Sequence, residues 1–217
     1  VAARKGIPLV AVGDIERTMN FGFVRIEGVV PAPPRVFSDA GRVTGLRFEV
    51  DDGTGALPVS AYRGKARALM ERDLVPRSGD RVSVAGSLSV SADRKILYLQ
   101  TPDHLELERL RLPPTPPSQI TVAMEDQPIA VEGIVASVRE PEPGTRRPWR
   151  VEMEGPEGRC VLVFWDDVAD HLSDDLLTTG RALHAFGTVS VYRDRPQVRL
   201  QAPTDLRPAN EEGETEP

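Results

Sequence analysis

The sequence predicts an all-β protein made of two tandem, five-stranded closed barrels, each with a helix between its third and fourth strands. Three observations lead to this prediction. Apolar and polar residues alternate with a period of two along most of the chain, which is typical of strands. The 217 residues include 20 prolines and 18 glycines, so the elements are short. An internal repeat also divides the chain into two halves.

The repeat consists of segments that return in the same order. Three segments of the first half recur in the second: VRIEGVV (24–30) as IAVEGIV (129–135), SGDRVSVAGSLSV (78–90) as TGRALHAFGTVSV (179–191), and LQTPDHL (99–105) as LQAPTDL (200–206). The offset changes only from 105 to 101 residues. The halves are therefore expected to be two copies of one fold.

Each copy is expected to contain five strands and one helix. In the first copy we expect strands near 23–30, 43–51, 56–62, 81–90 and 95–101, with a helix near 63–73. In the second copy we expect them near 129–138, 148–154, 159–165, 182–192 and 197–202, with a helix near 166–177. Alternation along the strands gives the first barrel an inward-facing set: Val24, Ile26, Leu46, Phe48, Val50, Leu57, Val59, Val82, Val84, Leu97 and Leu99. The first helix is expected to turn Ala66, Leu69 and Met70 inward, and Trp149, which aligns with Leu46, is expected in the second core.

The boundaries follow from composition. The first domain is predicted at 1–112, with a lead-in at 1–22, and the second at 119–208. Between them LPPTPPS contains a proline-rich linker at 113–118, which favours an extended spacer of about 3 Å per residue. The acidic tail at 209–217 has almost no apolar residues and is expected to be disordered. Because the chain begins with Val1, we expect it to be a piece of a longer protein.

Composition also argues against several classes of protein. Hydrophobic residues make up 40% and charged residues 28%, which is typical of a soluble globular protein. No apolar run approaches the roughly 18 residues of a membrane-spanning helix. We therefore expect a cytoplasmic fragment, with a membrane tether in missing parts left open. Cys160 is the only cysteine and the three histidines lack ligand spacing, so neither a disulfide nor a metal or other cofactor is expected.

The stretch DDGTG at 51–55 is predicted to turn the chain. A phosphate-binding loop would need a helix starting at the glycines and a following Lys-Ser or Lys-Thr, whereas a strand follows here. Asp51 with Asp52, and Asp166 with Asp167, resemble acid pairs, but adjacent strand residues point to opposite faces. No nucleophile and base stand together in the sequence. We therefore expect no enzymatic activity.

Segments of both copies carry a family resemblance. They are VRIEGVV, LRFEVDDGTGALPVSAY, SGDRVSVAGSLSV and ILYLQ in the first copy, and IAVEGIV, CVLVFWDDVADHL and TGRALHAFGTVSVYRDRPQVRLQ in the second. These resemble the oligonucleotide/oligosaccharide-binding (OB) fold, in the nucleic-acid-binding branch of replication protein A, exonuclease VII and RecG-type helicases. The resemblance covers roughly residues 20–206. It implies OB-type barrels that bind a single strand across strands two and three, between the first and last hairpin loops.

Outward positions at that implied site supply the cations and aromatic rings that single-strand binding needs. The candidates in the first copy are Arg47, Tyr62, Arg63, Lys65, Arg94, Lys95 and Tyr98. Those in the second copy are Arg150, Trp165, Tyr192, Arg193, Arg195 and Arg199. By the repeat, Trp165 occupies the position of Tyr62, Arg150 that of Arg47, and Arg199 that of Tyr98. The alternative interpretation is that Tyr62 and Trp165 only pack on the start of the helix and that the charges are solvated surface.

Charge differs between the copies. Residues 1–112 have a net charge of +3, residues 113–208 have −5, and the tail adds −4. Since phosphate binding is largely electrostatic, the first domain is the better candidate for single-stranded DNA or RNA. The second is expected to bind protein, or to use only its arginine-rich hairpin.

The predicted function is a non-catalytic single-stranded nucleic-acid-binding module. The alternatives are a protein-interaction or assembly module, as the soluble part of a membrane-linked protein, and carbohydrate binding.

Overall fold

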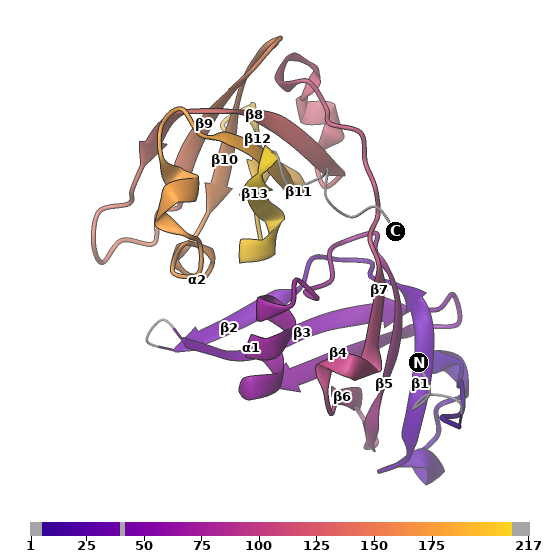
Figure 1. Cartoon of the computed structure of the whole chain (residues 1–217). Helices are drawn as coiled ribbons and strands as arrows, with labels where there is room; N and C mark the ends of the chain where they lie inside the picture. The colour runs from indigo at the N-terminus through magenta and orange to yellow at the C-terminus, as the bar shows by residue number, and fades with distance from the viewer. Residues whose placement is uncertain (1–5, 40–41, 210–217) are drawn as a thin grey trace, which may run out of the picture. The chain divides into compact units, whose positions relative to one another are not determined.

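The computed structural model describes residues 6–39 and 42–209, and the chain divides into two compact units between Leu110 and Arg111 (Figure 1). The expected acidic tail lies outside the described residues from position 210 onward, and so do the first five residues of the expected lead-in. Each unit is a β-structure built on the same plan.

The described part of the first unit contains seven strands and one α-helix. They are β1 (Phe23–Val29), β2 (Arg35–Asp39), β3 (Arg42–Asp51), β4 (Ala56–Tyr62), α1 (Gly64–Glu71), β5 (Arg81–Val90), β6 (Lys95–Leu99) and β7 (Leu105–Glu108). Strand β3 pairs with β1 and β4, β4 pairs in parallel with β6, and β5 pairs with β6 and β1. This circuit closes a five-stranded barrel with α1 between its third and fourth strands. The predicted fold class is confirmed.

The core of the first barrel is the inward set predicted from alternation. All eleven expected residues are buried, and Ile26, Val50, Leu57, Val59, Val84 and Leu97 have no exposed surface. Ala66 and Leu69 of α1 are also buried, whereas Met70, next to the last residue of the helix, is only half-buried. The period of two therefore identified the faces of the strands correctly.

Two strands of the first unit were not predicted. Strand β2 lies in a proline-rich stretch and pairs only with β3, and β7 is a four-residue strand on the edge of β5. Edge strands this short leave little periodicity in the sequence. The lead-in packs on the barrel as well, because the Val10 N–H donates to the Arg25 carbonyl (3.0 Å) and Val12 and Ile15 are buried.

The DDGTG stretch is a turn between β3 and β4, as predicted. Gly53 has a φ of +85°, which glycine adopts without strain. The Asp52 carboxylate accepts hydrogen bonds from the Thr54 hydroxyl (2.7 Å) and from the Val12 N–H (2.7 Å). The turn therefore also fastens the lead-in to the barrel.

The second unit repeats the barrel. Its elements are β8 (Pro128–Arg139), β9 (Trp149–Gly155), β10 (Gly158–Phe164), α2 (Asp166–Ala169), β11 (Ala182–Tyr192), β12 (Arg195–Arg199) and β13 (Leu206–Pro208). Strand β9 pairs with β8 and β10, β10 pairs in parallel with β12, and β11 pairs with β12 and β8. Strand β13 is a further short edge strand, on β11.

One expectation for the second unit needs correction. The single helix expected over 166–177 is instead α2 and a separate 3-10 turn at Asp174–Leu177. Residues 170–173 separate the two pieces. The Ser173 hydroxyl donates to the Asp175 carboxylate, a local contact of the kind that competes with helical backbone bonding. Part of the proline-rich stretch expected as a linker packs on the second unit. Pro117 is buried, and the Thr115 N–H donates to the Ala130 carbonyl of β8 (2.7 Å).

Candidate nucleic-acid interface

A continuous row of side chains crosses the outer face of the first barrel. Strand pairing places Arg35 of β2 opposite Arg47 of β3, Arg47 opposite Ser60 of β4, and Ser60 beside Tyr98 of β6. Their neighbours along the strands, such as Leu46, Val59 and Leu97, point into the core. By alternation the four residues of the row therefore share the outer face.

Three aromatic side chains lie on this face. Gly45 of β3 lies opposite both Phe37 of β2 and Tyr62 of β4. A Cβ on Gly45 would lie 3.4 Å from the Phe37 ring and 3.5 Å from the Tyr62 ring, so the glycine leaves the space between them open. The ring centroids of Tyr62 and Tyr98 are 5.9 Å apart, with 35° between the ring planes. Phe37 is 42% exposed and Tyr62 is 45% exposed, so these rings remain accessible to a ligand.

Three cations, Arg35 of β2, Arg47 of β3 and Lys65 of α1, lie on the strands that carry these rings or on elements next to them. The Arg47 guanidinium lies 6.0 Å from the Phe37 ring centroid, and its Nε donates to the Ser60 hydroxyl (3.3 Å). The Lys65 ammonium donates to the Gln100 amide oxygen (3.1 Å). Among the residues that the structure describes, no carboxylate forms an ion pair with Arg35, Arg47 or Lys65. We call this set, Phe37, Tyr62 and Tyr98 with Arg35, Arg47 and Lys65, the first-barrel patch.

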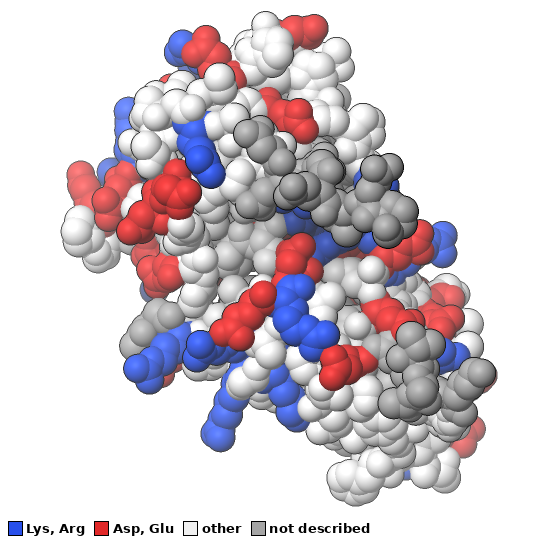
Figure 2. Space-filling view, viewed as in Figure 1, with Lys and Arg blue, Asp and Glu red and all other residues white. Residues whose placement is uncertain are grey.

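The first-barrel patch contains four of the seven residues predicted for this copy. The remaining three are exposed but have other positions. Arg63 precedes α1 with a φ of +51°. Arg94 and Lys95 lie at the β5–β6 hairpin, and Tyr98 is three positions after Lys95 along β6, which is about 10 Å. Figure 2 shows Lys and Arg side chains gathered over the part of the first unit that carries β2, β3 and α1.

Sequence reasoning missed Phe37 and Arg35 because it missed β2. A signal was present: in RVFSD the buried Val36 separates two exposed residues, which is the alternation of a strand. The prolines just before it hid this short run. Arg35 and Phe37 reach the patch only through the pairing of β2 with β3, which the sequence does not state.

The second barrel carries a different row at the same place. Arg139 of β8 lies opposite Arg150 of β9, Arg150 lies opposite Val163 of β10, and Val163 lies beside Arg199 of β12. In the described part of this unit, none of these three arginines forms an ion pair with a carboxylate. The row therefore presents positive charge but no aromatic ring.

Two tryptophans flank the second row. Trp165 is 39% exposed, and its indole N–H donates to the Arg146 carbonyl (3.3 Å), so the β8–β9 loop holds it. Trp149 is half-buried against the core and stacks on Phe164, with ring centroids 6.3 Å apart and 7° between the planes. Its indole N–H donates to Asp166 (3.0 Å). Trp149 is thus a packing residue, as expected.

The remaining candidates of the second copy lie at the β11–β12 hairpin. The Arg193 guanidinium is 5.2 Å from the Tyr192 ring centroid, and Tyr192 pairs with Arg195 across the hairpin. Tyr192 is more than half exposed. These three residues form a cation–aromatic cluster at the hairpin tip, and no hydrogen bond or ion pair in the described structure links it to the arginine row.

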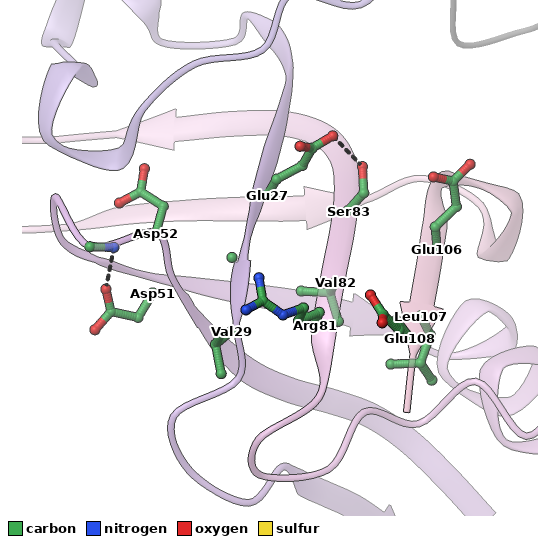
Figure 3. Close-up of a pocket in the computed structure, with 12 residues that line it drawn as sticks. Glu27, Val29, Asp51, Asp52, Arg81, Val82, Ser83, Glu106, Leu107 and Glu108 are labelled. Carbon is green, nitrogen blue, oxygen red and sulfur yellow. Dashed lines mark hydrogen bonds between the residues drawn. The ribbon is translucent and has the colours of Figure 1, made fainter. Parts of the chain in front are cut away.

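A hollow of about 620 Å³ lies elsewhere on the first barrel, at β1, β5, β7 and the DDGTG turn (Figure 3). Its charged lining is mainly acidic, and consists of Glu27, Asp51, Asp52, Glu106 and Glu108 with Arg81. Desolvation raises the pKa of Asp52, but hydrogen bonds from Thr54, Val12 and Gly55 outweigh it and lower the pKa below its ordinary value. With five carboxyl groups against one guanidinium, the lining of this hollow disfavours phosphate.

The described residues offer no metal site, no reactive thiol and no membrane-spanning helix. No group of three His, Cys, Asp or Glu side chains is arranged there to hold a metal ion. Burial raises the pKa of the Cys160 thiol to about 11, so the thiol stays protonated and unreactive at neutral pH. None of the helices described has the length and apolar character needed to cross a membrane.

Comparison with known proteins found structural likenesses only. Neither a protein-family model nor a curated protein matches the chain. A replication protein A heterotrimer bound to single-stranded DNA matches with a TM-score of 0.45 and 11% identity, over 91% of this chain and 50% of that chain. The second OB-fold domain of replication protein A from Methanococcus maripaludis matches with a TM-score of 0.33 and 16% identity, over 48% and 99%. The Ifi202 HINa domain in complex with double-stranded DNA matches with a TM-score of 0.37 and 10% identity, over 86% and 97%.

The fold itself rests on the strand pairing of this chain. The five barrel strands are β1, β3, β4, β5 and β6 in the first unit, and β8 to β12 in the second. Among these five, the first strand pairs with the second and fourth, and the third pairs in parallel with the fifth. A helix follows the third strand in both. This is the five-stranded barrel of the OB fold, built twice.

Proposed function

We propose that this chain is a non-catalytic module that binds single-stranded nucleic acid, mainly through the first-barrel patch. The observation that carries the proposal is the gathering of three exposed or half-exposed aromatic rings and three cations on one barrel face, where no carboxylate of the described residues pairs with these cations. Bases stack on such rings at about 1–3 kcal/mol each, and the cations neutralise phosphates. An apolar groove would favour a protein ligand instead, and this face is cationic.

The position of the patch supports the same function. It extends over β2, β3, β4 and β6, and in OB barrels the face of the second and third strands is where oligonucleotides bind. Two of the solved structures with a similar fold contain DNA, one single-stranded and one double-stranded. Stacking on the three rings favours binding that depends little on sequence, because every base has a π-face.

The second barrel is proposed to contribute phosphate contacts. Its row of Arg139, Arg150 and Arg199 faces outward without carboxylate partners in the described structure, but the place of Tyr98 is taken by Arg199. Charge contacts without stacking give weak, salt-sensitive binding. We therefore assign the tighter binding to the first barrel.

A titration with labelled oligothymidine and oligouridine of about 12–16 nucleotides, at low and moderate salt, tests the proposal. Each neutralised phosphate contributes about −0.7 to the slope of log affinity against log salt on a single strand. We expect Arg47→Gln to weaken binding and to make this slope less steep by about that amount. Arg159→Gln is the matched control, because Arg159 is exposed and paired with Glu154. Salt-independent binding, equal effects of the two variants, or equal competition by a duplex would contradict the proposal.

A further inference from the structure

Phe21 combines two unfavourable features. It is 82% exposed, the most exposed of the large apolar side chains in the described residues. Its φ is +67°, in the left-handed region that bulky residues rarely adopt. A large apolar side chain gains nothing from folding when it is exposed, and this backbone conformation adds a cost.

The second barrel shows that this turn does not require phenylalanine. Asp126 has the equivalent position and a φ of +65°. The Phe21 N–H donates to the Leu88 carbonyl (2.9 Å), and the Asp126 N–H donates to the equivalent Val189 carbonyl (2.9 Å). Aspartate tolerates this backbone conformation better than phenylalanine does. The ring of Phe21 is therefore not there to make the turn.

Phe21 lies where the outer row of the first barrel continues. Tyr98 pairs with Ser87 of β5, and Ser87 pairs with Phe23 of β1. Two strand spacings, about 10 Å, thus separate Tyr98 from Phe23, and Phe21 is two residues before Phe23. The cations Arg94 and Lys95 of the β5–β6 hairpin border the same region, because the Asn20 side chain accepts from the Val90 N–H (2.9 Å) just before the hairpin.

We propose that Phe21 is a further stacking platform for the strand after it has crossed the first-barrel patch and passed the β5–β6 hairpin. This inference rests on the proposed function, and it extends the footprint of the ligand around the barrel to β1. Nucleic acid is favoured over a second copy of the chain because the ring continues a row of aromatic and cationic residues. A contact at the end of the footprint engages only strands long enough to reach it.

The test compares Phe21→Asn with wild type in the full chain. Asparagine tolerates a positive φ and carries no charge, so the turn is kept while the ring is removed. Leu9→Asn is the control, because Leu9 is also an exposed apolar residue of the lead-in. Affinities are measured for oligothymidine of about 4 and about 16 nucleotides, the limits of the footprints known for this barrel. We expect Phe21→Asn to weaken binding of the long strand about 5- to 150-fold and to leave the short strand and the melting temperature unchanged.

Three outcomes would overturn the inference, and they can be told apart. If Phe21→Asn binds the long strand like wild type while Tyr62→Ala loses affinity, only the role of Phe21 is wrong. If wild type binds no single strand at either length, the proposed function fails as well. If Phe21→Asn changes the mass in light scattering and not the strand affinity, Phe21 is a contact between copies of the chain.

Discussion

The two barrels have the same strand order but present different side chains on the same outer face. At three equivalent positions the first barrel has Arg47, Ser60 and Tyr98, and the second has Arg150, Val163 and Arg199. The first also has Phe37 on β2, whereas no aromatic residue stands on β8 in the second. One scaffold thus carries an aromatic and cationic face in one copy and, in the other, a row of arginines and one valine without an aromatic ring.

This difference shows that the fold sets the place of a binding face and the side chains set its chemistry. The arginine is kept at the position of Arg47 and Arg150, so both faces can contact phosphate. Only the first adds a cluster of rings on which bases stack. Net charge separates the units in the same direction, with +3 against −5 for the two domains expected from the sequence.

Separating the units should produce the largest effect. When the chain is cut between Leu110 and Arg111, each half should fold alone and unfold cooperatively, because each closes its own barrel. The first half should keep most of the single-strand affinity, and the second should bind at least about 100-fold more weakly, which corresponds to the loss of two stacked bases. Circular dichroism and the same titration measure both. Two unfolded halves would contradict the two-barrel fold, and equal affinities would contradict the proposed difference between the barrels.

Exchanging the residues at one equivalent position should have the next largest effect. Tyr98→Arg gives the first barrel the residue of the second, and should weaken binding about 5- to 150-fold because a stacking ring is lost. Its salt slope should become steeper by about 0.7 if the new arginine contacts a phosphate. The reciprocal Arg199→Tyr in the isolated second half is the control. Affinity that is unchanged in both variants would show that this position does not set the difference between the barrels.

Much of this fold can be predicted from the sequence, but only part of the candidate site. The repeat and the period of two gave both barrels and the buried faces, since burial of one strand face leaves a regular pattern. Arg47 and Tyr62 followed from the same alternation. Phe37 did not, because it stands on a short edge strand that, among the described residues, pairs with β3 alone. The interruption of the second helix at 170–173 includes a local contact of Ser173 with Asp175, which periodicity does not report.

The smallest expected effects are changes in the stability of each unit at pH 7. Removing the carboxylate of Asp52 should lower the stability of the first unit, and removing that of Asp167 should raise the stability of the second. Hydrogen bonds to the carboxylate lower the pKa of Asp52 despite desolvation, so it stabilises the first unit above the unfolded pKa of about 3.9 and loses this effect as the pH falls through its folded pKa. Asp52→Ala should cost about 0.5–2 kcal/mol at pH 7, as for other capping side chains, and less at pH 3.

Asp167 in the second unit is the contrasting case. Desolvation, followed by the charges of Asp166 and Asp170, raises its pKa, so ionisation opposes folding as the pH rises through the unfolded pKa. Asp167→Asn should therefore increase stability at pH 7 and have little effect at pH 3. Urea denaturation of each half at both pH values measures the two effects. Effects of the same sign in both halves would contradict these assignments.

The most direct test of the first-barrel patch compares Tyr62→Ala with Trp165→Ala in the full chain. The two aromatic residues have equivalent positions at the ends of β4 and β10, but Tyr62 lies beside Phe37 and Tyr98, whereas the Arg146 carbonyl holds Trp165. Affinity for a 16-nucleotide oligothymidine and the melting temperature are measured for both variants. We predict that Tyr62→Ala loses about 5- to 150-fold in affinity with little change in melting temperature, and that Trp165→Ala loses stability with little change in affinity. A Tyr62→Ala variant that melts earlier yet, when folded, binds the strand like wild type would show that Tyr62 only packs, and the first-barrel patch would not be the binding site.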